Sequence, residues 1–199
     1  MNKSENILGY IIIGFILIIS IKMYYDNDYF QLKCIVSDVN GKKYCVRERN
    51  NLKEASNLLA SITMKMEKLV HYLGEKYPDK ENVKRLVKNF NPQKIKETLP
   101  TSEYTAYSEN KGEKLAFCLN NEKGGNKLID MNTLMYVALH EISHIASKSI
   151  GHTDEFWQNF KFFIEQANTI NIYKPVDYKK TPAKYCGMDI TDNPYFDIE

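Results

Sequence analysis

The sequence has no cluster of basic residues, although 27 of its 199 residues are Lys or Arg. Asp and Glu number 25 and are interleaved with them, so the net charge is only +2. Proteins that bind nucleic acid directly usually gather basic residues on one face, because the ligand is a polyanion. Nucleic acid is therefore not expected as a direct partner.

The chain also has no internal repeat and no composition typical of disorder. Hydrophobic residues make up 43% of it and charged residues 26%, which are ordinary proportions for a folded domain. Its 199 residues provide room for one globular domain with an accessory segment, but not for two full domains.

Charged residues are absent from Ile7–Ile21, which consists almost entirely of branched and aromatic side chains. Fifteen residues are too few to cross a hydrocarbon core about 30 Å thick. Lys22 can extend its ammonium to the interface, however, and the apolar stretch then continues to Tyr25. We expect residues 1–25 to form an uncleaved, single-pass anchor that contacts the lipid bilayer through Ile7–Tyr25.

The apolar stretch has two other interpretations. A cleaved signal peptide would need small residues before its cleavage site, where the sequence offers only Ser20. A buried core helix is the other alternative. Lys3 and Lys22 flank the two ends of the stretch, so the side of the membrane on which the domain lies stays open.

The cysteines do not have CxxC spacing, so we do not expect them to bind zinc. Two disulfide bonds and four free thiols are both compatible with the sequence. A two-residue turn at 40–41 would place Val36 opposite Cys45, whereas a four-residue loop at 38–41 would place Cys34 there and permit a bond. An even count on an anchored domain favours an oxidising compartment. The four residues are Cys34, Cys45, Cys118 and Cys186.

Residues 26–50 have the pattern of a polar hinge followed by a β-hairpin. Two runs of alternating polarity, Leu32–Val39 and Lys42–Arg47, flank the dipeptide Asn40-Gly41. Asn-Gly between alternating runs is a strong signal for a hairpin turn.

Residues 51–199 have the pattern of an α+β domain. Apolar residues recur at helical spacing from Asn51 to Leu73, and Gly74 and Pro78 are expected to end this helix. The later elements are expected to be a helix over Glu81–Phe90, a loop over Leu99–Asn110, a strand over Lys114–Leu119, a helix from about Asp130 to Ser149, a helix that begins at Thr153, and a tail after Tyr173 that wraps the surface.

The segment His140–His144 (HEISH) lies inside a predicted helix, and its spacing suits a metal ion. Residues four apart project from one helical face, so His140 and His144 can bind the same zinc. Glu141 then lies beside the ion, where it can accept a proton from a zinc-bound water and pass it to a leaving amine.

A catalytic zinc site needs a third protein ligand, and His152 is the candidate. It follows Gly151, where the chain must turn after the first helix, so its ring can return to the metal. Three of the four histidines lie within thirteen residues. The fourth, His71, falls on the long helix and is expected to be a surface or packing residue.

The segments His140–His144 and Gly151–Trp157 resemble those of the WLM-type zincin metallopeptidases, which are related to the SprT and Spartan proteases. The resemblance extends from Leu115 to Gln166 and is looser over Tyr185–Met188. It implies a zincin-like fold with a small mixed sheet, an active-site helix beneath the sheet's edge strand, and a second helix. It also implies that the edge strand, here Lys114–Leu119, pairs with an extended substrate by strand addition.

The chain departs from this family in three respects. Seven residues separate His144 from His152, where fungal WLM enzymes have five. Ser147 stands where metzincins have Gly, so the chain is not a metzincin, and ordinary packing is favoured for Met188 over a methionine turn. Some WLM relatives act on proteins crosslinked to DNA, but an anchored chain without a basic patch does not support that substrate.

The sequence thus predicts a membrane-anchored zinc metalloendopeptidase that hydrolyses a protein or peptide substrate. The alternatives are a non-catalytic membrane scaffold with a structural zinc and a protease acting on DNA-crosslinked proteins. Glu141 discriminates against the scaffold, because a structural site has no use for a carboxylate there. A loop tyrosine could stabilise the oxyanion, and the candidates are Tyr104, Tyr107, Tyr173, Tyr178 and Tyr185.

Overall fold

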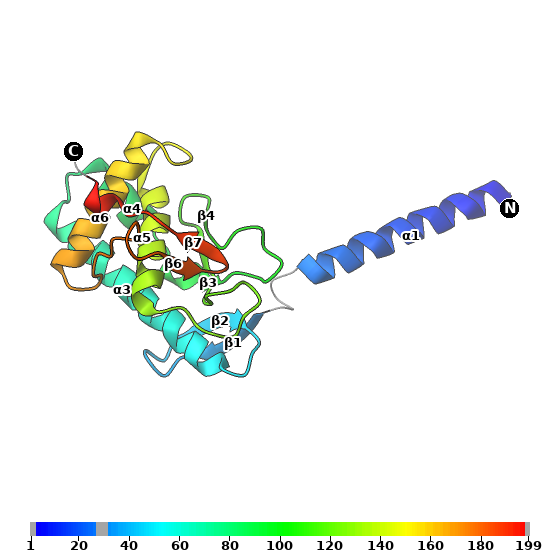
Figure 1. Ribbon diagram of the computed structural model, residues 1–199. Helices are drawn as coiled ribbons and strands as arrows, with labels where there is room; N and C mark the ends of the chain where they lie inside the picture. Colours follow the sequence, from blue (N-terminus) through cyan, green and yellow to red (C-terminus); the bar gives the residue numbers. More distant parts are fainter. Residues whose placement is uncertain (1–2, 27–31, 198–199) are drawn as a thin grey trace.

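The first helix of the computed structural model, α1 (Lys3–Asp26), lies apart from the other elements, as Figure 1 shows. The structure describes residues 3–26 and 32–197. Within α1, Ile7–Tyr24 is long and apolar enough to cross a membrane, and none of this span is buried against the rest of the protein. A signal sequence near an N-terminus can meet the same criteria of length and composition, so α1 is compatible with either interpretation.

Strands β1 (Leu32–Val36) and β2 (Lys43–Arg47) form the predicted antiparallel hairpin, with Cys34 opposite Cys45. The N–H of Ser37 donates to the carbonyl of Lys42 at 3.0 Å, so the loop has the four residues 38–41. The first strand is therefore shorter than the predicted Leu32–Val39, because the chain already turns after Ser37. A disulfide joins Cys34 to Cys45.

Helix α3 (Leu52–Lys76) buries its apolar stripe, and α4 (Glu81–Asn89) packs against it. Gly74, which was predicted to end α3, lies inside it. A Cβ on Gly74 would lie 3.2 Å from Val87, so the glycine permits the close approach of α4. Helix α3 ends instead at Lys76, because the proline ring of Pro78 disfavours helical backbone at Tyr77.

A three-stranded sheet follows the short helix η1 (Pro92–Lys94). Strand β5 (Lys114–Phe117) lies at its centre, parallel to β3 (Ile95–Glu97) and antiparallel to β4 (Ala106–Glu109). The prediction that Lys114–Leu119 is an edge strand is therefore wrong, because both of its sides are paired. The prediction of a loop over Leu99–Asn110 is also wrong, since β4 forms there and packs against α5.

Helices α5 (Met131–Ala146) and α6 (Asp154–Thr169) pack against each other, as Figure 1 shows. Helix α5 begins where the carboxylate of Asp130 accepts the N–H of Thr133 at 2.9 Å, an N-cap interaction. It ends before the predicted Ser149, because the backbone of Ser147 is extended.

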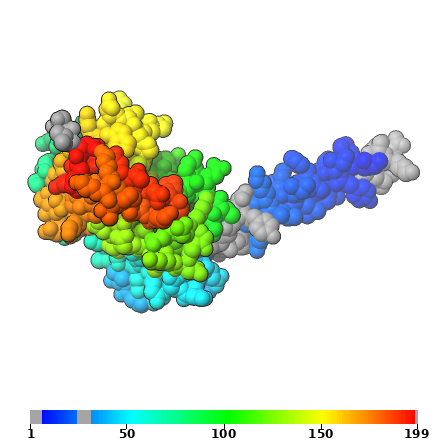
Figure 2. Space-filling model, in the orientation of Figure 1, coloured from blue at the N-terminus to red at the C-terminus, as the bar shows by residue number. Residues whose placement is uncertain are grey.

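The tail crosses one face of the domain, as predicted and as Figure 2 shows, but it also contains secondary structure. Strands β6 (Ala183–Tyr185) and β7 (Met188–Ile190) form a hairpin, and η2 (Pro194–Phe196) follows. Positive φ angles at Cys186 and Gly187 make its turn, and their N–H groups donate to the carbonyls of Asn120 and Asn121. A second disulfide joins Cys186 to Cys118.

A buried ionic cluster attaches the N-terminal hairpin to the sheet. The fully buried carboxylate of Glu97 forms ion pairs with Arg47 and Arg49. Arg47 also donates from Nε to the carbonyl of Thr98 at 2.6 Å. Since Tyr44 and Val46 of β2 belong to the main hydrophobic core, the hairpin and the later elements share one interior.

The two disulfides close chain segments of different length, which predicts different contributions to stability. The sequence separations are 68 for Cys118–Cys186 and 11 for Cys34–Cys45. In the chain-entropy model, loss of the longer crosslink costs about 4 kcal/mol and loss of the shorter one about 3 kcal/mol. We therefore expect the double variant Cys118→Ser/Cys186→Ser to lose more free energy of unfolding than Cys34→Ser/Cys45→Ser, as measured by urea unfolding without reductant. Alkylation of all four cysteines in the unreduced, unfolded protein would contradict the two bonds.

Candidate metal centre

The structure brings the three predicted histidines together. His140 and His144 lie one turn apart on α5, and the loop 147–153 returns His152 to them. The Nε2 atom of His140 lies 3.2 Å from that of His144 and 3.1 Å from that of His152. Zinc–nitrogen bonds of 2.0–2.1 Å in a tetrahedral site place two nitrogens about 3.3 Å apart. The spacing of the rings therefore fits one zinc ion held by three imidazoles.

Phe156, in the first turn of α6, packs against all three imidazoles. Its ring centroid lies 4.8 Å from that of His140, 4.4 Å from that of His144 and 4.7 Å from that of His152. Because Phe156 is fully buried, it is a fixed surface that limits the orientations of the three rings. The residue is therefore a positioning element of the cluster.

The protonation of His140 and His144 favours metal binding. Burial, followed by the neighbouring histidines, lowers the pKa of His140 to about 3. Burial, followed by His152 and the ammonium of Lys111, lowers the pKa of His144 to about 4. Both imidazoles are therefore neutral near pH 7, and the neutral form is the one that coordinates a metal ion.

Glu141 carries a buried carboxyl group, and only 5% of the residue is exposed. Among the described residues, no hydrogen bond or salt bridge reaches this carboxyl group, and burial raises its pKa to about 8. A buried carboxylate without a partner is costly in a folded protein. A cation held by the adjacent histidines would supply the missing counter-charge.

The five candidate tyrosines differ in their surroundings. The hydroxyl of Tyr185 accepts the N–H of Cys118 at 3.0 Å and donates to the carbonyl of Thr105 at 3.2 Å. Tyr173 accepts from Asn193, Tyr178 is buried against Tyr136, and Tyr104 and Tyr107 pack against each other. Within residues 3–26 and 32–197, none of the five hydroxyls hydrogen-bonds to the three histidines. An oxyanion role for any of them stays a prediction.

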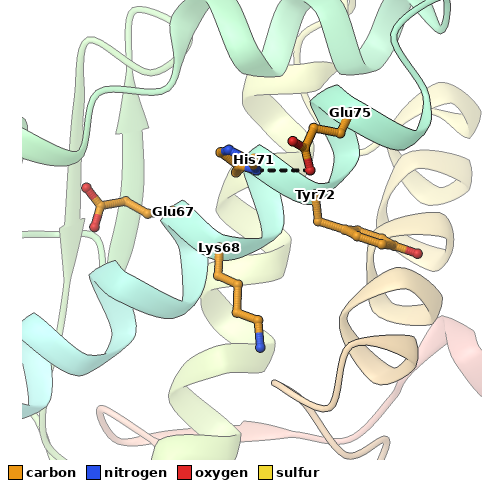
Figure 3. Close-up of a pocket in the computed structure, with 5 residues that line it drawn as sticks. All are labelled: Glu67, Lys68, His71, Tyr72 and Glu75. Atoms are coloured by element: carbon orange, nitrogen blue, oxygen red, sulfur yellow. Dashed lines mark ion pairs between the residues drawn. The ribbon is translucent and has the colours of Figure 1, made fainter.

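Two further residues singled out in the sequence lie outside the cluster. Met188 is 53% exposed on β7, so it neither underlies the imidazoles nor packs in the core. His71 lines a shallow hollow on α3 with Glu67, Lys68, Tyr72 and Glu75, and Figure 3 shows its pairing with Glu75. The expectation that His71 is a surface residue is confirmed by its 72% exposed side chain.

Phe156 and Lys111 also belong to the surroundings of the cluster, and the sequence patterns assigned neither of them a role there. Phe156 was assigned to the apolar stripe of its helix, although it lies in the segment Gly151–Trp157 that carries the family resemblance, which was a usable signal. Lys111 lies in the turn between β4 and β5, far from the histidines along the chain, and no local pattern could identify it.

Comparisons with known proteins identify viral relatives. No family model matches the chain. The chain is 36% identical over 163 residues to "Uncharacterized protein R325" of Acanthamoeba polyphaga mimivirus. The matched region covers 80% of this chain and 82% of that protein. It is 31% identical over 75 residues to "Uncharacterized protein 136R" of Invertebrate iridescent virus 6, covering 37% and 41% of the two proteins. Among solved structures, Wss1 from Saccharomyces cerevisiae is similar over 62% of this chain and 84% of that chain, with 20% identity and a TM-score of 0.46.

Removal of one cluster histidine should abolish tight zinc binding. Loss of an outer partner of a zinc ligand typically weakens metal affinity about 10- to 100-fold, and loss of a ligand should cost more. We therefore expect His152→Ala to lower zinc affinity by more than 100-fold, measured by competition with a chromophoric chelator on the full chain in detergent. The control, His71→Ala, should bind zinc like the parent protein. Equal affinity of both variants would contradict the site.

The metal-free protein should become less stable as the pH rises through the titration of Glu141. Its pKa is about 8 in the folded protein against an ordinary value of 4.5, so the folded state binds more protons between these values. Stability contributed by this group is therefore present below about pH 4.5 and lost as the pH rises towards 8. In urea unfolding after chelation, the free energy of unfolding of the parent protein should fall relative to that of Glu141→Gln over this pH interval. If the free energies of unfolding of the parent and of Glu141→Gln change in parallel with pH, Glu141 does not ionise in a buried site.

Proposed function

The chain belongs to the same protein family as mimivirus R325, and we propose that it is a zinc-dependent endopeptidase anchored in a membrane by α1. His140, His144 and His152 are the proposed zinc ligands, and Glu141 is the proposed general base. The short distances from the Nε2 atom of His140 to those of His144 and His152, and the neutral state of the buried His140 and His144, support zinc binding.

The buried carboxyl group of Glu141 is the observation that carries the proposal of catalysis. A structural zinc would be held by the three imidazoles and a fourth closed ligand, and a neighbouring carboxylate without hydrogen bonds would only lower stability. Strongly perturbed carboxyl groups beside a metal site are typical of acid–base catalysts. Enzymatic hydrolysis is therefore favoured over a non-catalytic scaffold.

In the proposed reaction, Glu141 moves one proton. A bound zinc supplies a Lewis acid that polarises the peptide carbonyl and acidifies water. The Glu141 carboxylate accepts a proton from the attacking water and delivers it to the nitrogen of the leaving amine. Burial suits this exchange, because it raises the pKa of the Glu141 carboxyl group towards the higher pKa values of the water and the amine with which it exchanges a proton.

Strand β4 is the proposed docking edge for an extended substrate. It is an outer strand of the three-stranded sheet and packs against α5, which carries Glu141 and two of the histidines. An outer strand has unpaired backbone groups that can bind a peptide by strand addition. This proposal moves the substrate strand from Lys114–Leu119 to Ala106–Glu109.

The disulfides support a location outside reducing cytosol. Both pairs of cysteines are bonded, and no cysteine among the described residues is free. Disulfides persist mainly in oxidising compartments. We place the domain on the oxidising side of a membrane, with α1 spanning the bilayer.

The proposal is tested by Glu141→Gln in the full chain, solubilised in detergent and loaded with zinc. The amide preserves the shape of the side chain but cannot accept a proton, so cleavage of a reduced, alkylated protein should fall about 10²- to 10⁴-fold. Zinc content should not change. Cleavage would be followed by mass spectrometry of the new termini.

Glu165→Gln is the matched control, because Glu165 is an exposed carboxylate on α6. It should cleave like the parent protein. If the Glu141→Gln variant binds zinc and cleaves as fast as this control, the proposed mechanism is wrong.

A further inference from the structure

The loop 147–153, which carries the third histidine, has little apolar attachment to the domain beyond the packing of the His152 ring against Phe156 and Trp157. Five of its residues are exposed, and its one large hydrophobic side chain, Ile150, is 89% exposed. Gly151 has a φ of +82°, a left-handed conformation that favours glycine and turns the chain towards His152. Apart from the packing of the His152 ring, the loop is therefore held in position by polar contacts.

Lys111 contacts the loop from the side of the sheet. Its ammonium donates to the carbonyls of His144 at 3.3 Å and Ser147 at 2.9 Å, and also to that of Ser149. A cation at the carboxyl end of a helix satisfies free carbonyls and interacts favourably with the helix dipole. Lys111 thus ties the end of α5 to the beginning of the loop.

The turn that presents Lys111 is specially shaped. Asn110, Lys111 and Gly112 have consecutive positive φ angles of 46°, 57° and 109°. A Cβ on Gly112 would lie 2.6 Å from the carbonyl oxygen of Asn89 and 3.1 Å from Ile145 of α5. The glycine therefore lets the turn approach the last turn of α5 closely enough for the ammonium of Lys111 to reach the loop.

Glu155 contacts the hydrogen-bond donors of the same loop. Its carboxylate accepts the N–H of Lys148 at 3.0 Å, the N–H of Ser149 at 3.1 Å and the hydroxyl of Ser149 at 2.9 Å. These donors hold the pKa of Glu155 below its usual value, so it is ionised near pH 7.

Arg85 of α4 connects Glu155 to the end of α5. It donates from Nε to the carbonyl of Ala146 at 2.6 Å and from Nη2 to Glu155 at 2.8 Å. Lys111 and Glu155 thus contact the seven-residue loop itself, and Arg85 joins Glu155 to the last residue of α5.

We propose that Arg85, Lys111 and Glu155 form a loop clamp that holds His152 at the distance from His140 and His144 required for a shared zinc ion. These are positioning residues, and the inference rests on the proposed zinc site. Seven residues separate His144 from His152. A connection of this length in solvent can adopt many conformations, and ordering them costs conformational entropy when the metal binds. Contacts to both the carbonyls and the amides of the loop restrict these conformations before binding.

The test uses two pairs of variants of the full chain in detergent. Lys111→Met removes the ammonium that donates to the carbonyls of the loop. Lys148→Met removes the same charge from an exposed side chain of that loop. Glu155→Gln removes the carboxylate that accepts the loop amides, and Asp154→Asn neutralises the exposed neighbouring carboxylate in the first turn of α6. Far-UV circular dichroism checks that each variant folds.

Zinc affinity and the absorption spectrum of the cobalt-substituted protein are measured for all four variants. Lys111→Met and Glu155→Gln should bind zinc about 10- to 100-fold more weakly than the parent, as expected for outer partners of a metal site. Their cobalt spectra should shift towards that of His152→Ala. Lys148→Met and Asp154→Asn should stay within about twofold of the parent. In metal-free protein, Glu155→Gln should also speed hydrogen exchange at the amides of Lys148 and Ser149.

The outcomes separate this inference from the proposed function. If the parent protein binds zinc through three imidazoles and both clamp variants bind it equally tightly with an unchanged cobalt spectrum, the clamp is wrong and the zinc site stands. If the parent does not bind zinc, the site itself is wrong and the clamp has no ligand to position. Should Lys111→Met fail to fold, Glu155→Gln decides the question alone.

Discussion

Beyond the first turn of α5, every residue is buried except His140 and His144, and this burial governs the rest of the structure. A helix enclosed in this way can present polar groups only where neighbouring elements leave an opening. Helix α6 and the loop 147–153 leave that opening over the two histidines and return His152 to it. The same enclosure buries most of Glu141, and this burial raises the pKa of its carboxyl group. The packing of one helix thus creates both the histidine cluster and the buried carboxyl group beside it.

The surrounding elements hold this opening in place by different means. Phe156 supports the imidazoles from α6, whereas Lys111 and Glu155 attach the connecting loop through its backbone and Arg85 joins Glu155 to the end of α5. On the other side, the disulfide between Cys118 and Cys186 joins the end of β5 to the tail, and Tyr185 hydrogen-bonds to the same region. The apolar core supports the helices, and directional contacts set the finer geometry around the histidines.

The helical elements and the candidate site could be predicted from the sequence because their signals are local. The spacing of His140 and His144, the glycine before His152 and the N-cap at Asp130 each depend on a few neighbouring residues. Strand β4 has only four residues without clear alternation, so its pattern indicates a loop. Because β4 pairs with β5, the edge position that the family resemblance implied for Lys114–Leu119 is wrong. The clamp by Lys111 depends on a turn of two non-glycine residues and one glycine with positive φ, a conformation that residue types alone do not specify.

Zinc K-edge X-ray absorption of the zinc-loaded full chain tests the central claim most directly, because it reports the ligand atoms of the ion. The geometry of the cluster predicts nitrogen neighbours at about 2.0–2.1 Å, imidazole scattering that corresponds to three histidines, and one further oxygen ligand. A shell of sulfur neighbours near 2.3 Å, or a spectrum without three imidazoles, would contradict the account.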